Sequence, residues 1–422
     1  MKYTDFNYTI KRHLIGIKQS LISKIHLKIH FNYLPNTATY NFSQNFRTMK
    51  LIKYFFFLPA SAVLLFLACN PTTTNLLQSG NWVSLTVSPG NTRFQAVSFV
   101  VGDTAYVGTG YDGNVRYNDF FSFSVKDGWS NAQQIASLPS GPNASDSAPA
   151  RNGAVAFAIG RNGYITTGTD GYTKYNDTWA YNVDNGTWTR AADFPSTPRY
   201  GASAFALLGK GYVTCGYDNQ YKKDNWQFSP TGTTNGLPGT WIQMAQIGET
   251  STAHSDLNAI YSAAGNPRLN AITFVHGDSA YIVGGLGQSG ANVNDFYKFL
   301  PPSVSGISQG KWVGLRVISN ASTENYDDDY SDIVRNSGVG FVMGDSAYIT
   351  VGINGGYTQK TWAYDFKTDL WSRKSNFERS GREGAVAFVI NGRGFVSSGK
   401  ASGSYFFDLE EFQPYIALNT ND

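Results

Sequence analysis

Six arginines recur along the chain and offer the clearest chemistry in the sequence. They are Arg93, Arg151, Arg199, Arg268, Arg335 and Arg382. A guanidinium group presents paired N–H donors in one plane, which suits a carboxylate or another anion. If the six side chains surround a common centre, they could form a collar that binds such a ligand. The alternative is that each arginine pairs with an aspartate of its own repeat or caps loop carbonyls.

The arginines set the frame of an internal repeat. Six residues after each arginine stands a phenylalanine, thirteen after it an aromatic residue, and four residues further on a glycine. An aspartate follows in five units, Asp119, Asp177, Asp224, Asp295 and Asp408, whereas the fifth unit has Lys360 there. Five units end with a tryptophan. The sixth tryptophan is found at the other end of the repeat region, because Trp82 precedes Arg93 by the 11 residues that separate Trp188 from Arg199.

Each unit predicts four short strands separated by glycine or Asn-Gly turns. One such sheet cannot bury both faces, so the units must stack on one another, which is typical of a β-propeller. Residues 80–422 resemble the Kelch-type propellers, whose repeat has the same starting arginine, the glycine after the second strand, and the aromatic and tryptophan positions. Only Gly284-Gly285 keeps the double glycine of that family. We therefore expect an all-β, six-bladed Kelch-type β-propeller whose last blade is closed by the strand containing Trp82.

The loops on one face of such a ring are the predicted binding surface. Loops between blades and loops between second and third strands share this face, and three inter-blade connections are longer than the rest. Tyrosines in these loops could stack on sugar rings or anchor a peptide, or they could pack adjacent loops together. The candidate ligand-binding residues are therefore the six arginines with Tyr111, Tyr172, Tyr217 and Tyr357. Because Lys360 replaces the repeat aspartate, Arg335 is expected to be the arginine most available to a ligand.

A hydrophobic segment near the N-terminus predicts export. Met49 opens a short basic stretch, and an apolar run then ends in Leu67-Ala68-Cys69. This segment resembles a bacterial lipoprotein signal, in which the cysteine is acylated and becomes the new N-terminus. We expect residues 1–48 to be an over-extended start without an assigned fold, 49–68 the signal peptide, Cys69 the lipid anchor and 69–79 a polar tether. An uncleaved anchor and a plain cleaved signal peptide are the alternatives.

The composition limits the partners. The chain has 422 residues, 41% of them hydrophobic and 15% charged, which is ample for a large core. Residues 1–68 hold nine basic side chains and one acidic one, so the net charge of +3 leaves −5 for residues 69–422. A mildly acidic body argues against binding to nucleic acid. The expected protein is a monomer in the bacterial cell envelope, at its periplasmic face or on the cell surface, with the membrane and a glycan or another protein as its partners.

The sequence contains no catalytic constellation. Copper enzymes on Kelch-type propellers, such as galactose oxidase, need two histidines, tyrosine ligands and a tyrosine joined to a cysteine. The mature chain has only His254 and His276, and its one cysteine besides the anchor is Cys215. Cys215 falls at the offset occupied elsewhere by Thr109, Thr167 and Ser398, so we expect a buried small residue there. The acidic loop 324–332 could hold calcium but lacks the EF-hand pattern. We expect a non-catalytic binding module with no cofactor, no metal and no catalytic residue. The alternative is a sugar epimerase or mutarotase, because periplasmic N-acetylneuraminate epimerases resemble this arrangement of six Kelch blades behind a secretory signal.

Overall fold

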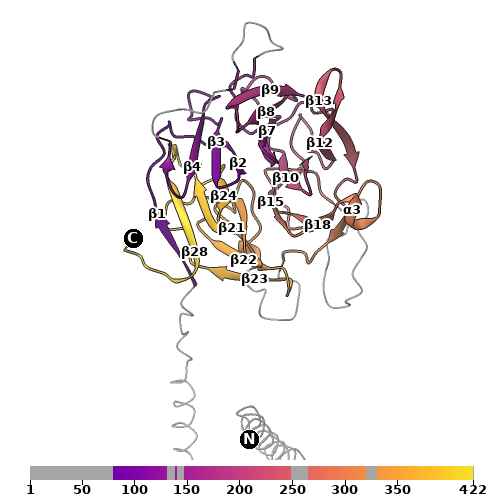
Figure 1. Cartoon of the computed structure of the whole chain (residues 1–422). Coiled ribbons are helices and arrows are strands. Elements are labelled where there is room, and N and C mark those ends of the chain that lie inside the picture. The colour runs from indigo at the N-terminus through magenta and orange to yellow at the C-terminus, as the bar shows by residue number, and fades with distance from the viewer. Residues whose placement is uncertain (1–78, 131–137, 140–146, 249–264, 320–329, 422) are drawn as a thin grey trace, which may run out of the picture. The chain divides into compact units, whose positions relative to one another are not determined.

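The chain folds into six four-stranded antiparallel sheets, the blades of a β-propeller (Figure 1). The computed structural model describes residues 79–130, 138–139, 147–248, 265–319 and 330–421. The first strands of neighbouring blades contact one another around a central channel. The expected all-β, six-bladed propeller is therefore confirmed. The predicted lipid anchor, signal peptide and tether, as well as His254, lie outside the described residues.

The strands follow the repeat in chain order. The first three blades consist of β2 (Val97–Val101), β3 (Thr104–Gly108), β4 (Phe120–Ser124) and β5 (Gly128–Trp129); β6 (Val155–Ile159), β7 (Asn162–Thr166), β8 (Thr178–Asn182) and β9 (Thr187–Ala191); and β10 (Ser203–Leu207), β11 (Lys210–Thr214), β12 (Asn225–Thr234) and β13 (Leu237–Met244). The fourth and fifth consist of β15 (Ile272–His276), β16 (Ser279–Val283), β18 (Phe296–Leu300) and β19 (Lys311–Gly314); and β20 (Val339–Met343), β21 (Ser346–Thr350), β22 (Thr361–Asp365) and β23 (Leu370–Lys374).

The sixth blade joins the two ends of the propeller domain. It contains β24 (Val386–Ile390), β25 (Arg393–Ser397) and β28 (Leu409–Ala417), and its outer strand is β1 (Ser79–Ser84) from the start of the described chain. Trp82 lies opposite Phe412 in this pairing. The predicted closure by the Trp82 strand is therefore confirmed, and the ring has no unpaired blade.

Short elements complete the structure. They are β14 (Arg268–Leu269), which pairs with β17 (Leu286–Gly287), β26 (Lys400–Ala401), which pairs with β27 (Ser404–Tyr405), the helix α3 (Pro302–Ser305) and the 3-10 helix η3 (Tyr330–Asp332).

Aromatic stacking explains why the repeat keeps its spacing. In every blade the phenylalanine six residues after the arginine stacks on the aromatic residue thirteen after it, with ring centroids 4.9–5.7 Å apart. The phenylalanine also packs against the next blade. A Cβ on Gly163 would come within 2.1 Å of the Phe99 ring, so this position needs a residue without a side chain.

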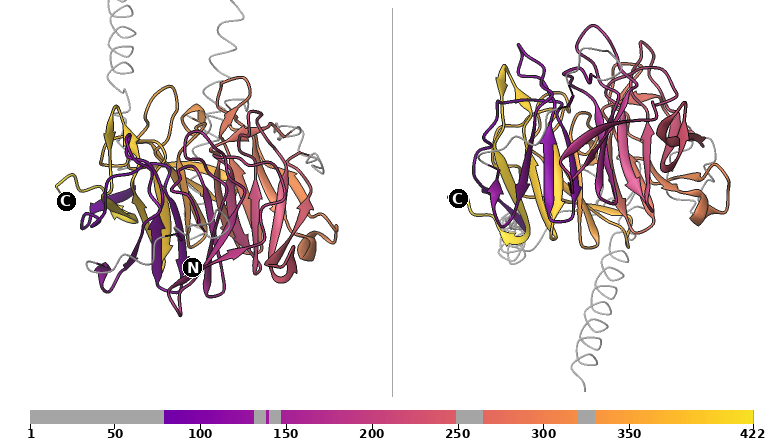
Figure 2. Two further views of the ribbon diagram at one scale, coloured as in Figure 1. Left: turned by 90° about the horizontal axis from the view of Figure 1, so that it is seen from above. Right: turned by 45° about the horizontal axis from the view of Figure 1, so that its top comes forward.

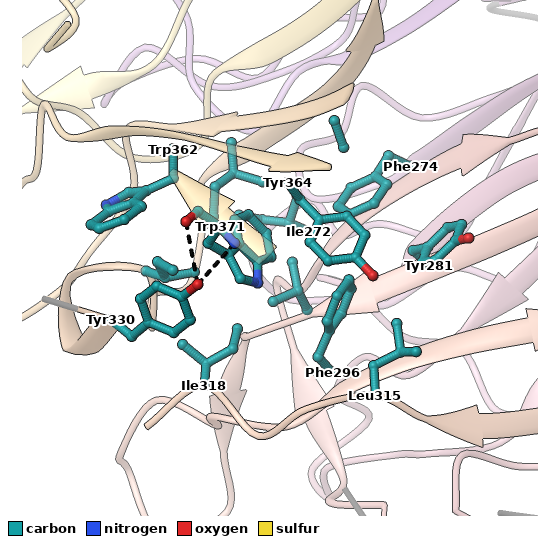
Figure 3. Close-up of a cluster of buried hydrophobic side chains, with 14 residues drawn as sticks. Ile272, Phe274, Tyr281, Phe296, Leu315, Ile318, Tyr330, Trp362, Tyr364 and Trp371 are labelled. Carbon is teal, nitrogen blue, oxygen red and sulfur yellow. Dashed lines mark hydrogen bonds between the residues drawn. The ribbon is translucent and has the colours of Figure 1, made fainter. Parts of the chain in front are cut away.

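The long connection between the fourth and fifth blades also contributes to the core. Tyr330 packs against Trp362 between these blades, and its hydroxyl accepts a hydrogen bond from the Trp371 amide at 2.9 Å and donates one to the Trp371 carbonyl at 3.2 Å (Figure 3). The end of this connection thus takes part in the packing between the fourth and fifth blades.

The strand directions define two faces. Val97 at the start of β2 pairs with Gly108 at the end of β3, so the loops between blades and those between second and third strands share one end of each sheet. We call this end the mouth face. The turns that join first to second strands and third to fourth strands lie at the other end of each sheet. Figure 2 shows the strands running between these two ends.

Candidate functional site

The six repeat arginines lie inside the blades. Each guanidinium group is at most 1% exposed. Arg151 is representative: its Nη1 and Nη2 donate to the two carboxylate oxygens of Asp177 at 2.5 and 2.7 Å, Nη1 also donates to the Thr167 carbonyl, and Nε donates to the Pro149 carbonyl. Arg93, Arg199, Arg268 and Arg382 pair in the same way with Asp119, Asp224, Asp295 and Asp408. These are the structural contacts that the sequence left open as the alternative to a ligand collar.

Arg335 keeps the same position without an aspartate. Its donors bond to four backbone carbonyls, including those of Val351 and Lys360. Lys360 instead forms an ion pair with Asp332, which lies three residues before the arginine. Burial lowers the pKa of the Arg335 guanidinium, and the nearby Asp332 charge only partly opposes this. The side chain is fully buried, so a ligand at the surface does not reach it.

A closed belt of backbone hydrogen bonds frames the central channel. It consists of the residues two positions after each arginine: Gln95, Gly153, Gly201, Asn270, Ser337 and Gly384. Each amide donates to the carbonyl of the equivalent residue in a neighbouring blade, over 2.7–3.0 Å. All six have a left-handed backbone, with φ between 52° and 64°. The belt fixes the six blades to one another at the mouth of the channel.

Two small cavities follow the channel axis behind this belt. The first, of about 140 Å³, is lined by the belt and by the residues that follow it, such as Ala154 and Gly338. The second, of about 190 Å³, continues past the same layer to residues such as Ser98 and Thr273. No charged residue is among those that line either cavity in the described part of the chain. The described lining of these cavities therefore offers no charged partner to a ligand.

Arg116 supplies a cation at the mouth. It lies in the loop between β3 and β4, its guanidinium carbon is 4.4 Å from the centre of the Tyr111 ring, and its Nε donates to Asn152 Oδ1 at 2.7 Å. Asn152 Nδ2 donates in turn to Gln95 Oε1 at 2.5 Å. This chain of hydrogen bonds links the loop to the belt. Among the described residues no carboxylate lies within 4 Å of Arg116, although its charge helps to lower the pKa of the neighbouring Asp170. Its terminal amino groups lie beside Gly171 of the next loop, where an anion at the mouth could meet them.

Lys174 occupies the equivalent position in the second blade. Arg116 and Lys174 each form a backbone bridge with the residue that follows the repeat glycine, Tyr111 in the first blade and Thr169 in the second. The Lys174 amino group donates to Asn219 Oδ1 at 2.9 Å and has no acidic partner among the described residues. Neither cation is among the site residues predicted from the sequence. Their shared offset, six residues after Gly110 and Gly168, is the signal that could have identified them.

The predicted tyrosines differ in their surroundings. Tyr172 is 97% exposed at the tip of its loop, and Tyr357 is 39% exposed. Tyr217 packs edge-on against Tyr200 and Tyr221, and the Tyr111 hydroxyl donates to the Gly113 carbonyl. Tyr172 and Tyr357 are thus the two of the four with large exposed side chains, whereas Tyr111 and Tyr217 are partly buried against their neighbours.

Two other loop tyrosines have a clear structural role. The Tyr117 hydroxyl donates to Asp112 and the Tyr175 hydroxyl to Asp170, each at 2.5 Å. Burial and the hydrogen bond to Asp112 raise the pKa of Tyr117 to about 12. The Tyr175 ring lies against the buried Arg151 guanidinium. The two tyrosines thus hold the loops between second and third strands close to the buried arginine–aspartate ion pairs.

An ion pair from the sixth blade completes the mouth. Lys400 Nζ lies 3.3 Å from a carboxylate oxygen of Glu383, and it also lies 4.2 Å from the centre of the Phe94 ring. Glu383 directly follows Arg382, and Phe94 directly follows Arg93, so both stand one position before the belt. The mouth therefore combines cations and aromatic faces with acids such as Glu383, Asp112 and Asp170.

The described residues contain no group of three or more histidine, cysteine, aspartate or glutamate side chains placed to hold a metal ion. Cys215 is buried, and this burial raises the pKa of its thiol to about 11. Most of the acidic loop 324–332 lies outside the described residues. No helix within the described ranges has the length and apolar character needed to cross a membrane.

Comparison with known proteins supports the fold alone. No protein-family model matches the sequence, and no curated protein matches it. Chains of known structure do match, including one described as "Structure of YjhT", with a TM-score of 0.56 and 16% sequence identity over 77% of this chain and 95% of that one. At this identity the likeness extends to the arrangement of the blades. This chain is thus similar in architecture to that protein, and the repeat, the closure and the channel all belong to a six-bladed β-propeller.

Proposed function

We propose that the protein is a non-catalytic binding module that takes a carboxylate-bearing glycan at the mouth face. The observation that carries this proposal is Arg116, a cation that forms no ion pair among the described residues and is oriented by Asn152 and by the Tyr111 ring. Paired guanidinium donors suit a carboxylate, and the neighbouring aromatic faces suit the apolar side of a sugar ring. Lys174 adds a second cation at the equivalent position of the second blade.

The Kelch type and the lipid anchor belong to the same proposal. The arginine frame, the repeat glycine and the tryptophan positions support a divergent Kelch repeat. The basic stretch, the apolar run and Cys69 support a lipoprotein of the bacterial cell envelope. Anchored in this way, the propeller would present its mouth to ligands at the membrane surface.

A second candidate function is an epimerase or mutarotase for an acidic sugar. The Glu383–Lys400 ion pair favours it, because exchange at a sugar carbon needs an acid and a base beside the bound ring. In the structure Glu383 and Lys400 are paired with each other, so neither is free to transfer a proton to a sugar. This function therefore has less support than binding alone.

The two functions are separated by binding and turnover measurements on the same protein. Titration calorimetry with uronic acids and sialic acids should give saturable binding, and NMR exchange spectroscopy should show no acceleration of anomer exchange. Replacing Arg116→Gln removes a charged hydrogen bond worth about 1.5–3 kcal/mol, so affinity should fall roughly 10- to 100-fold.

The matched control is Arg161→Gln. Arg161 is exposed in the turn between β6 and β7, at the end of the sheet opposite the mouth, where it pairs with Asp184. Its loss should leave the affinity unchanged. Equal effects of both substitutions would reject the mouth as the site, and accelerated anomer exchange that is lost in Glu383→Gln would favour the enzyme.

A further inference from the structure

The C-terminal end of β28 leaves the core as an apolar edge. The strand is buried from Leu409 to Phe412, whereas Tyr415, Ile416 and the following Leu418 are 83%, 52% and 41% exposed. Three of the eleven large exposed hydrophobic side chains in the described residues thus fall within four consecutive positions. Single exposed apolar residues are ordinary, but a cluster calls for a partner.

This edge lies at the perimeter of the sixth blade, beside the mouth end of β23, where the Ser375 amide donates to the Ser79 carbonyl. β28 begins beside the mouth at Leu409, which pairs with Ser397, and it runs away from the mouth toward Ala417. Figure 1 shows β28 and β1 together at the perimeter of the propeller, and both views of Figure 2 place the C-terminus there.

The start of the described chain lies beside the same edge. Ser79 pairs with Ala417, and the Asn419 amide donates to Asn81 Oδ1 at 2.6 Å. Ser79 follows Cys69 by ten positions, and a fully extended chain spans at most about 3.6 Å per position, or roughly 35 Å. A lipid on Cys69 would therefore hold this edge within that distance of the membrane.

The chemistry of the edge suits a membrane surface. Tyrosine favours the boundary between lipid and water, and isoleucine and leucine side chains gain free energy by entering the acyl region. Lys374 Nζ donates to the Ser79 hydroxyl at 2.8 Å, which places a cation beside this edge at the perimeter, within reach of anionic headgroups that contact it. The nearby acid Glu411 is already bonded by Arg393 through both carboxylate oxygens.

We propose that Tyr415, Ile416 and Leu418 form a membrane-facing edge that rests on the bilayer to which Cys69 is attached, so that the lipid lies at the perimeter of the sixth blade and not over the mouth. This inference rests on the lipid anchor of the proposed function. The anchor supplies attachment, and the edge supplies orientation.

Fluorescence quenching by brominated lipid tests the orientation. The mature protein, acylated on Cys69, is reconstituted into vesicles of brominated phosphatidylcholine with an anionic phospholipid. One variant has a bimane label on Ile416→Cys and the other on Val115→Cys, a mouth-face loop residue of nearly equal exposure, 52% against 53%. Cys215 is fully buried and does not compete for the label.

We expect the label at position 416 to be quenched several-fold more strongly than the label at position 115. Adding Tyr415→Ser and Leu418→Ser to Ile416→Cys should remove the difference while the protein still floats with the vesicles. Flotation with equal quenching at both positions would overturn the orientation and leave the anchor standing. Cross-linking of position 416 to a second copy without quenching would also overturn it, and failure to float would reject the anchor and the orientation together.

Discussion

At the residue scale, the buried arginine pairs hold each blade together, and their effect on stability can be measured. Asp177→Asn leaves the buried Arg151 without its counter-charge, which typically costs about 3–5 kcal/mol. The matched control is Asp184→Asn, because the Asp184–Arg161 pair is solvent-exposed and should contribute nothing measurable. Urea unfolding should show a lower midpoint for the first variant alone. Similar midpoints for both variants would mean that the buried pair adds nothing beyond a surface pair.

The same aspartate predicts how stability depends on pH. Burial raises the pKa of Asp177, but the hydrogen bond and charge of Arg151 outweigh it and leave the pKa below its ordinary value of 3.8. A depressed pKa in the folded state means that the unfolded chain binds the proton more tightly. The stabilisation is therefore complete above the ordinary pKa and is lost as pH falls through the folded value. Unfolding measured from neutral pH to below 4 should show a steeper acid decline in the wild type than in Asp177→Asn.

The exception at Arg335 offers a repair experiment. Arg199 has Ser196 three residues before it and Asp224 as its partner, whereas Arg335 has Asp332 and Lys360 at these positions. The double change Asp332→Ser and Lys360→Asp rebuilds the arrangement of the third blade, and we expect a gain of about 1–3 kcal/mol. Thermal unfolding should show a higher midpoint. The single change Lys360→Asp should lower it, because two carboxylates would then face each other, and a stabilised single variant would contradict this account.

At the element scale, the closure of the ring depends on β1. Trp82 is 1% exposed between Phe377 and Phe412, with ring centroids 4.9 and 4.7 Å away. Trp82→Ala should cost about 3–5 kcal/mol and release the edge of β28. Trp82→Phe keeps an aromatic ring, and the indole N–H that it removes has no hydrogen-bond partner among the described residues, so it should cost less. Hydrogen exchange should rise along β28 in the alanine variant and stay low in the phenylalanine variant.

The elements were largely predictable from the sequence because the repeat fixes strand pairing. The arginine at the start of each unit and the aspartate 25–27 residues later meet in five blades, and the interval from Trp82 to Arg93 predicted the closure. Spacing does not reveal which donors are already occupied. The arginines were therefore predicted either to bind a ligand or to pair with the repeat aspartates, and their burial in the structure supports the pairing.

The mouth itself was less predictable. Arg116 looks like any loop cation in the sequence, and its lack of an ion pair among the described residues depends on how two neighbouring loops lie against each other. The left-handed backbone at Gln95, Asn270 and Ser337 is equally hidden, because only the glycines of the belt signal it. Side-chain direction at a junction of six blades is a tertiary property, and periodicity does not encode it.

At the scale of the whole molecule, the belt makes the mouth a preformed and asymmetric surface. Six backbone bonds close around the axis, so the loops above it start from fixed positions. Gly153 and Gly201 lie next to each other in the belt, whereas Asn270 and Ser337 bring side chains to another arc. We call the part of the belt formed by these two glycines the open arc, and it adjoins the blades that carry Arg116 and Lys174. A ligand held by these cations would therefore extend over the glycines.

Filling the open arc should block binding without unfolding the ring. Gly153 has φ of +64°, a conformation that asparagine tolerates and that Asn270 already adopts at +54°. A Cβ there would meet only ordinary contacts, the nearest at 3.4 Å. We expect Gly153→Asn to change stability by less than about 1 kcal/mol and to weaken binding of the acidic sugar about tenfold, or 1.4 kcal/mol. The control is Gly128→Asn, a turn position with φ of +72° and open space around it. Calorimetry that shows full affinity in Gly153→Asn would place the ligand outside the mouth.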